Sequence, residues 1–138
     1  FPADIMEKDQ LDQAIKGSEV VYLTLGIEYK SKIWQKKWPR IMSNVITSCK
    51  RHRVKLVFFD NIYMYDKEQM DPMTEETPVN PSSKKGKVRA EIAQMITSEV
   101  EKKELTALIA RAADFLGPKN SLFTEMVIKN MMNGKKAN

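Results

Sequence analysis

Short apolar runs alternate with longer amphipathic segments along this chain, and this alternation constrains the fold more than any other feature. Residues 20–25 form a nearly unbroken apolar and β-branched run, which is typical of a strand buried on both faces in a parallel sheet. Residues 54–59 and 105–110 have the same character. A stretch with helical spacing of its apolar residues precedes each run. The sequence therefore predicts an α/β fold with a doubly wound parallel sheet and right-handed crossovers.

Four helices are expected, over residues 8–16, 33–53, 85–103 and 121–133. Pro39 lies inside the second of them and should begin a new helical segment or kink the old one. Ser82 or Ser83 is available as the N-cap of the third helix. Residues 60–84, between the second apolar run and the third helix, contain several prolines and acidic residues. A loop of that length inside a compact domain is usually functional.

The composition is that of an ordinary globular protein. The 138 residues are 42% hydrophobic and 30% charged, which fits one domain. No apolar run approaches the ~20 residues that cross a bilayer, so no membrane partner is expected. Cys49 and His52 are the only cysteine and histidine, so we expect neither a disulfide nor a metal site, and we interpret Cys49 as a small buried hydrophobe. The lone cysteine fits a cytoplasmic location.

The net charge of +5 gives little support to a nucleic-acid partner. The 23 basic residues are interleaved with 18 acidic ones. The densest basic cluster, Lys84, Lys85, Lys87 and Arg89, is explained equally well by a solvated helix start and by a phosphate site. Positive charge at a helix N-terminus opposes the helix dipole. This conflict favours a functional role for at least one of these basic residues. Without interleaved aromatic residues nucleic acid is unlikely, and an anionic dinucleotide is the better partner.

Five segments carry a resemblance in the same order along the chain: KGSEVVYLTLG within residues 3–26, MSNVITSCKRHRVKLVFFDN at 42–61, YMYD at 63–66, TEETPVNP at 74–81 and ARAADFLGP at 110–118. They resemble the extended short-chain dehydrogenases/reductases, and among these the NAD-dependent epimerase/dehydratase group. Members of that group often act on nucleotide sugars. The resemblance implies that residues 1–138 are the middle part of a single NAD(P)-binding domain with a partial Rossmann-like sheet, preceded by roughly fifty to seventy residues that contain a glycine-rich loop.

The resemblance also implies a coenzyme, NAD or NADP, and the residues that would bind it. Asp4 and Ile5 match an aspartate–hydrophobic pair that lies against the adenine ring. The strand end at residues 23–26 matches the part beneath the nicotinamide ribose and the pyrophosphate. Asn44 matches a structural asparagine, or is equally well a polar residue on a helix face. The expected cofactor-binding residues are Asp4, Ile5, Leu23, Leu25, Gly26 and Lys87.

The catalytic positions depart from the family pattern. The family uses Tyr-x-x-x-Lys, because this spacing places phenol and ammonium on one helix face and lowers the phenol pKa from about 10. Lys87 matches the lysine, but Ser83 stands at the tyrosine position, and Asn61 replaces a serine or threonine. Tyr63 or Tyr65 could supply a phenol from another direction, and we favour a packing role for Tyr65. The catalytic candidates are therefore Lys87, Asn61, Ser83 and Tyr63.

Two functions stay open from the sequence. The first is an NAD(P)-dependent epimerase, dehydratase or reductase acting on a nucleotide sugar or a related small molecule. The alternative is a non-catalytic NAD(P)-binding sensor that lost the catalytic tyrosine. Loop 60–84 and Gly117–Pro118 favour the first, since they match substrate-binding segments. The strand at 20–25 has an unguarded apolar edge, and helices 33–53 and 85–103 present the faces that such enzymes use to dimerise. We therefore expect a homo-oligomer.

Overall fold

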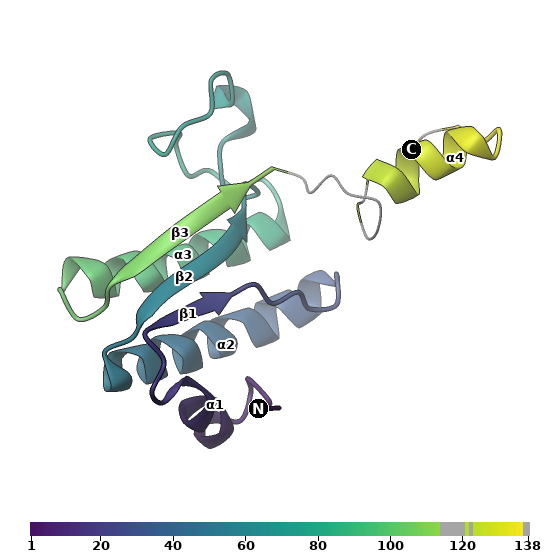
Figure 1. Cartoon of the computed structure of the whole chain (residues 1–138). Helices are drawn as coiled ribbons and strands as arrows, with labels where there is room; N and C mark the ends of the chain where they lie inside the picture. Colours follow the sequence, from purple (N-terminus) through teal and green to yellow (C-terminus); the bar gives the residue numbers. More distant parts are fainter. Residues whose placement is uncertain (114–120, 122, 137–138) are drawn as a thin grey trace.

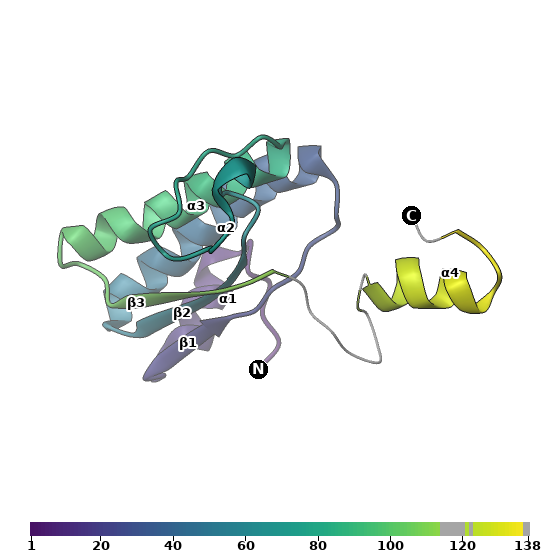
Figure 2. The same ribbon diagram turned by 90° about the horizontal axis from the view of Figure 1, so that it is seen from above.

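The computed structural model describes residues 1–113, 121 and 123–136. Within this part of the chain, three parallel strands form one sheet in the order β1-β2-β3, namely β1 (Val20–Leu23), β2 (Lys55–Asn61) and β3 (Ala107–Ala112). The helices that precede and connect the strands are α1 (Lys8–Ile15), α2 (Ser31–His52) and α3 (Lys84–Glu101). Figures 1 and 2 show these helices as a layer against the sheet. The predicted α/β fold class is confirmed.

The predicted elements lie within three residues of the observed ones at every end. The loop between β2 and α3 contains a short 3-10 helix, η1 (Lys67–Gln69). Near the C-terminus the helical stretch divides into a π-helical part, η2 (Thr124–Ile128), and α4 (Lys129–Met132). Ser83 is the N-cap of α3, because its Oγ accepts a hydrogen bond from Gly86 N at 2.9 Å. Among the described residues, no helix has the length and apolar character needed to cross a membrane.

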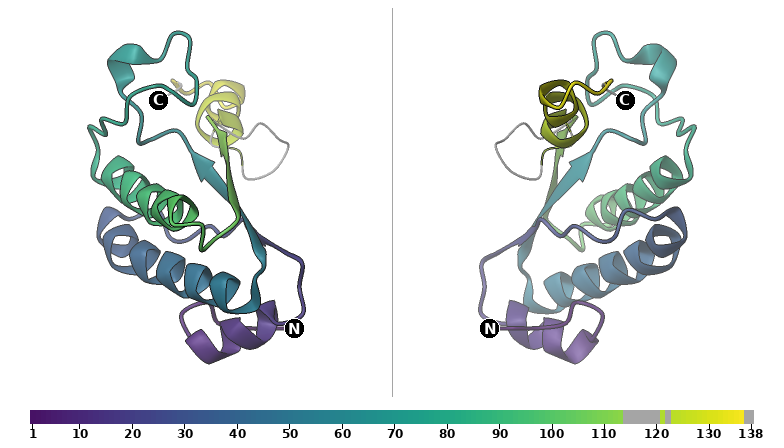
Figure 3. Two further views of the ribbon diagram at one scale, coloured as in Figure 1. Left: turned by 90° about the vertical axis from the view of Figure 1, so that its left-hand side faces the viewer. Right: turned by 90° about the vertical axis from the view of Figure 1, so that its right-hand side faces the viewer.

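The three strands are covered on one face only, so the expectation that they are buried on both faces is wrong for the described part of the chain. The view along the sheet in Figure 3 shows α1, α2 and α3 on the same side of it. On the other face Tyr22 is 69% exposed, Leu108 is 58% exposed and Phe59 is 42% exposed. Apolar composition shows that a strand can be buried, but only the tertiary structure shows which faces a layer covers.

Helix α2 passes through Pro39 as one element, so of the two alternatives at this proline, a new helical segment or a kink, the first is wrong. A proline inside a helix removes one backbone hydrogen bond. The packing of Trp38, the residue next to the proline, compensates for the lost hydrogen bond. Trp38 is fully buried, with its ring centroid 6.1 Å from that of Trp34 and 6.1 Å from that of Phe58 on β2. These edge-to-face contacts hold the helix against the sheet across the proline.

An ion-pair network joins the C-terminal ends of α2 and α3. Lys50 on α2 contacts Glu99 on α3 and also Glu104, which follows that helix. Lys102 Nζ lies 2.7 Å from Glu99 Oε1. Hydrogen bonds from Lys102 and Lys50 lower the pKa of Glu99 from 4.5 to about 2. The charged form of Glu99 therefore supports the contact between the two helices.

This network predicts acid sensitivity. Because the pKa of Glu99 is about 2 in the folded chain and 4.5 in the reference state, its contribution to the free energy of unfolding is complete above the higher value and is lost as the pH falls toward the lower one. We expect Glu99→Gln to reduce the drop in melting temperature over that range. Glu91→Gln, at an exposed position of the same helix, is the control. An equal drop in the Glu99→Gln variant and the unmodified protein would contradict this account.

Candidate functional site

The carboxyl ends of the three parallel strands lie at one edge of the sheet (Figure 1). Ligands of open α/β sheets bind at this edge. The segments that follow β1 and β2, together with the first turn of α3, enclose a pocket of about 410 Å³ there. We call it the tyrosine–lysine pocket, and it is lined by Tyr29, Ser31, Tyr63, Lys67, Ser83, Lys84 and Lys85.

Two phenols meet in this pocket. The hydroxyl of Tyr29 donates a hydrogen bond to the hydroxyl of Tyr63, with 3.3 Å between the oxygens. Trp34 at the start of α2 positions Tyr29: the ring centroids are 5.5 Å apart at 88°, and Trp34 Nε1 donates to the carbonyl of Glu28 at 3.0 Å. Lys85 Nζ lies 2.9 Å from the centroid of the Tyr29 ring. The pocket therefore holds an ammonium group over the ring of one of two hydrogen-bonded phenols.

Gly86 lets α3 approach the loop that carries Tyr63. A Cβ atom at this position would overlap with the carbonyl oxygen of Tyr63 and would lie 2.9 Å from the Cβ of Pro81. Glycine is therefore required because the backbones come into contact here. This contact sets the distance between Tyr63 and the first turn of α3.

A buried ionic network lies behind the pocket. Asp60 on β2 is directly opposite Arg111 on β3 in the strand register, and its carboxylate lies 3.9 Å from Arg111 Nε. Arg89 Nη1 reaches the same carboxylate from α3 at 3.3 Å. The Arg89 guanidinium lies over the rings of Trp34 and Trp38, at 4.4 and 4.3 Å from their centroids. The network therefore ties two strands and two helices together at the edge of the sheet where the pocket opens.

Arg89 is buried, so the solvated-helix interpretation of the basic cluster is wrong for this member. Burial lowers the pKa of Arg89, and the attraction of Asp60, Tyr63 and Tyr29 opposes that change. Burial also raises the pKa of Asp60, against the opposing effect of Arg89. A positive charge on Arg89 therefore acts on both phenol groups of the pocket.

The structure brings together two of the four catalytic candidates. Tyr63 and Ser83 both line the tyrosine–lysine pocket. Asn61 lies beside it, and its Oδ1 accepts a hydrogen bond from Tyr63 N at 3.0 Å, which positions the Tyr63 loop. Lys87 is exposed and is not part of the pocket lining. Residues two positions apart in an α-helix point about 200° apart, so Lys87 faces away from the side on which Lys85 lies.

The predicted adenine-side residues are held against α2. Asp4 Oδ1 accepts a hydrogen bond from Met6 N at 2.8 Å. The side-chain amide of Asn44 donates to the carbonyl of Ile5 at 3.1 Å. Asn44 thus connects the N-terminal segment to α2, which is the structural role that the resemblance implied.

The end of β1 leaves room for a ligand. Leu23 is buried in the core and Leu25 is half-buried against it. Gly26, by contrast, is exposed, and a Cβ placed on it would meet nothing within 4 Å. The backbone at the carboxyl end of β1 is therefore accessible at Gly26, which leaves space for a dinucleotide there.

Sequence reasoning overlooked Tyr29, and it named Lys85 only as one member of a basic cluster that fits a solvated helix start or a phosphate site. Tyr29 stands in what reads as a polar connection between a strand and a helix, and its position in the segment that follows a strand end was the available signal. Tyr65, in contrast, is buried, and its hydroxyl accepts a hydrogen bond from Arg111 at 3.0 Å, as expected for a packing residue. The expected substrate segment at 114–118 lies outside the described residues.

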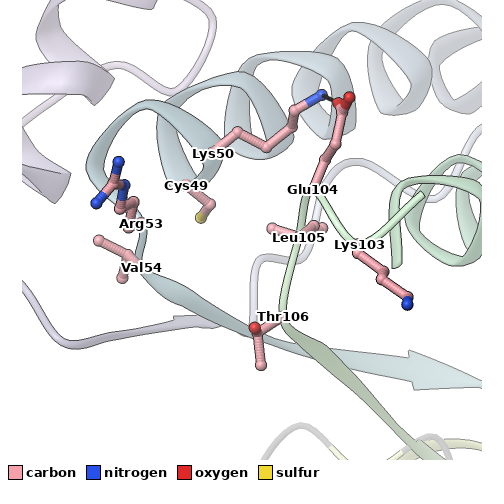
Figure 4. A pocket seen from close by; sticks show the side chains of 8 residues that line it. All are labelled: Cys49, Lys50, Arg53, Val54, Lys103, Glu104, Leu105 and Thr106. Carbon is pink, nitrogen blue, oxygen red and sulfur yellow. Dashed lines mark hydrogen bonds and ion pairs between the residues drawn. The ribbon is translucent and has the colours of Figure 1, made fainter. Parts of the chain in front are cut away.

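A second hollow, of about 440 Å³, lies at the opposite edge of the sheet, where β2 and β3 begin (Figure 4). Cys49, Lys50 and Arg53 contribute to its wall. Burial raises the pKa of the Cys49 thiol to about 11, so this cysteine is not a nucleophile near neutral pH. Lys50 is engaged by two glutamates. This hollow therefore has no reactive thiol, and it lacks the pair of phenols found at the carboxyl edge.

The model of the NAD dependent epimerase/dehydratase family matches residues 1–138, and the chain belongs to this family. The same fold occurs in UDP-glucuronic acid 4-epimerase from Bacillus cereus in complex with NAD, with a TM-score of 0.81 and 17% identity over 97% of this chain. It also occurs in GDP-mannoheptose C4 reductase from Campylobacter jejuni with NADP bound, with a TM-score of 0.78 and 20% identity over 94% of this chain.

A double mutant of a dTDP-glucose 4,6-dehydratase from Streptomyces venezuelae also has this fold, with a TM-score of 0.77 and 15% identity over 96% of this chain. The chain spans less than half of these three proteins: 45% of the epimerase, 46% of the reductase and 44% of the dehydratase. A comparison with curated protein sequences finds no match. Together the structural matches establish the fold.

The contact at Gly86 makes a prediction about the pocket. In Gly86→Ala, the new methyl group must push α3 away from the Tyr63 carbonyl, and overpacking of this kind costs about 1–3 kcal/mol of unfolding free energy. Gly26→Ala is the matched control, because its Cβ enters open space. Denaturant unfolding of both variants is the measurement. If Gly86→Ala loses no more stability than Gly26→Ala, the backbone contact is not as close as described.

Proposed function

We propose that the complete protein is an NAD(P)-dependent epimerase, dehydratase or reductase that acts on a nucleotide sugar or a related small molecule. Family membership supports the reaction class, and the pair of phenols in the tyrosine–lysine pocket is the observation that carries the proposal. A bound nicotinamide would accept or donate a hydride at a sugar carbon. A side chain of this chain must then move the proton of the hydroxyl on that carbon.

Tyr63 is the proposed proton-transfer group. Its hydroxyl is already hydrogen-bonded to that of Tyr29, so a second phenol can share or replace its proton. A phenol is a better acid than a serine hydroxyl, and nearby cations favour its ionised form. Ser83 lines the same pocket and is placed to bind a substrate hydroxyl. Asn61 positions the Tyr63 loop through its hydrogen bond to Tyr63 N.

The proposed coenzyme site comprises Asp4, Ile5, Leu23, Leu25 and Gly26, and its support is the open backbone at the end of β1. A role for Lys87 at the nicotinamide ribose requires the coenzyme to reach the exposed side of α3. The alternative function, a non-catalytic NAD(P)-binding sensor, is favoured by Ser83 at the position of the family tyrosine, where it caps α3.

Hydride exchange separates the two functions. We expect the complete protein to bind NAD(H) or NADP(H) and to exchange label between the reduced coenzyme and a nucleotide sugar. Tyr63→Phe should slow the exchange by about 10²–10⁴-fold, the usual contribution of a general acid–base group, while coenzyme affinity is retained. Tyr22→Phe, on the exposed sheet face, is the control. Coenzyme binding without exchange in the unmodified protein would identify a sensor instead.

We further propose that residues 1–138 are the middle of a single NAD(P)-binding Rossmann domain. The fraction of the structural neighbours that the chain spans supports this. So does β1, which pairs only with β2 within the described residues and therefore has a strand edge available for another strand. A cytoplasmic location belongs to the same proposal and rests on the lone cysteine of the sequence.

A homo-oligomer built through α2 and α3 is also proposed. A groove of about 380 Å³ runs between these helices, lined by Ser43, Ile46, Thr47, Lys50, Met95, Ser98 and Glu99. Its small and apolar side chains allow close packing against the same helices of a second copy, the arrangement that the family resemblance implies.

Light scattering of the complete protein tests the oligomer. The expected mass is that of a dimer or a higher oligomer. Ser43→Arg, which places a long cation in the groove, should shift the mass toward the monomer. Asp9→Arg, at an exposed position of α1, should leave it unchanged. A monomeric unmodified protein would refute the proposal.

A further inference from the structure

Tyr29 is exposed to solvent and yet closely held. More than half of the residue, 56%, is exposed. Its ring packs edge-on against Trp34, and the ammonium of Lys85 lies over its face. The carbonyl of Glu28, the residue before it, accepts hydrogen bonds from Trp34 Nε1 at 3.0 Å and from Lys30 N at 2.8 Å. Ordering a side chain costs conformational entropy, and an exposed ring recovers little of it by burial. Packing alone therefore does not account for this arrangement.

The two phenols of the tyrosine–lysine pocket differ in their access to solvent. Tyr63 is half-buried, whereas Tyr29 is exposed. The backbone of Tyr63 is held by Asn61, which accepts from its N–H, and by the contact of Gly86 with its carbonyl. The Tyr63 hydroxyl accepts a hydrogen bond from Tyr29 at 3.3 Å. A phenol oxygen that accepts one hydrogen bond can still donate its own hydrogen. The bond therefore runs from the solvent-facing phenol to the phenol that is proposed to transfer the proton.

Positive charge lies along the same path. Lys85 and Arg89 are four residues apart on α3, so they share one face of the helix. Both lie near Trp34, with Lys85 Nζ 5.8 Å and the Arg89 guanidinium 4.4 Å from its ring centroid. Arg89 is paired with Asp60. Lys85, by contrast, has no acidic partner among the residues that the structure describes. A negative charge that forms on Tyr29 would therefore face the ammonium of Lys85.

We propose that Tyr29 is a proton relay between solvent and Tyr63. This inference rests on the proposed function and adds a second residue to its proton path. When a sugar carbonyl takes up a hydride from the reduced coenzyme, Tyr63 gives its hydroxyl proton to the carbonyl oxygen. Tyr29 gives its own proton to the Tyr63 oxygen along the existing hydrogen bond, and a proton from solvent then restores the Tyr29 hydroxyl. The net change is one proton moved from solvent to the substrate oxygen, and each step reverses when the sugar is oxidised.

Lys85 is a positioning residue in this relay. Its ammonium holds the Tyr29 ring from one face, and it faces the phenolate that exists on Tyr29 until solvent restores the proton. The relay thus places its transient negative charge at the exposed end of the path, beside a cation.

The hydrogen bond between the two phenols can be tested without turnover. In the complete protein with tyrosines isotope-labelled at the ring carbon that bears the hydroxyl, the NMR signal of Tyr63 is the one that Tyr63→Phe removes. We expect Tyr29→Phe to shift this signal, because the Tyr63 hydroxyl loses a donor. Tyr22→Phe, on the uncovered face of the sheet, is the matched control and should leave the signal unchanged. A Tyr63 signal that does not respond to Tyr29→Phe would overturn the relay.

Hydride transfer in a single turnover tests the relay itself. Tyr29→Phe keeps the ring but lacks the hydroxyl, and it should slow the transfer about 10–100-fold, less than the loss of Tyr63, while coenzyme affinity is retained. In mixtures of light and heavy water, the rate of the unmodified protein should fall along a curve, because two protons move. The rate of Tyr29→Phe should fall along a straight line. Lys85→Gln should also slow the transfer, and Lys85→Arg, which keeps a cation over the ring, should restore most of the rate.

The outcomes separate the relay from the proposed function. A purely structural role of Tyr29 would leave the heavy-water dependence curved in Tyr29→Phe, and this result would overturn the relay. So would a full rate in that variant, or a straight line for the unmodified protein. Each of these results would leave the proposed function standing. Absence of hydride transfer in the unmodified protein would overturn the proposed function and the relay with it.

Discussion

Asp60 places a carboxylate in the interior of the molecule at the carboxyl end of β2, and the arrangement of the functional edge depends on how its charge is balanced. Arg89 and Arg111 approach it from α3 and β3. Breaking a buried ion pair by removing one partner usually costs about 3–5 kcal/mol. The Asp60–Arg89 pair therefore fixes how α3 lies against the strands. Trp34 and Trp38 complete the enclosure, because they stack on the Arg89 guanidinium from α2.

The tyrosine–lysine pocket is a consequence of this arrangement. With α3 fixed by Arg89, its first turn carries Lys84 and Lys85 to the carboxyl edge of the sheet, and Gly86 allows it to touch the Tyr63 loop. With Trp34 fixed in the same cluster, Tyr29 is brought to within hydrogen-bond distance of Tyr63. Trp34 therefore links the core interaction to the candidate site, since it contacts both Arg89 and Tyr29. A change at the buried pair would alter function as well as stability.

The chain belongs to the NAD-dependent epimerase/dehydratase family. Ser83, at the position where the sequence resemblance leads us to expect a tyrosine, caps α3 through its hydroxyl. The phenols come instead from loops that follow β1 and β2. The physical requirement is a phenol with a cation beside it, and the structure offers that combination on different elements. This is why we propose retained chemistry rather than simple loss of activity.

The sequence by itself determined the order of elements, the parallel sheet and the family, because apolar runs and helical spacing are local properties of the chain. It also placed Tyr63 after a strand and Ser83 before a helix, where the structure has them. Only the tertiary structure decided that Arg89 is buried while Lys87 is exposed, since the helix face that meets the sheet depends on Asp60 and on the tryptophans of α2. Likewise, Tyr29 joined the site only through packing against Trp34, a contact between a loop and a helix that no local pattern specifies.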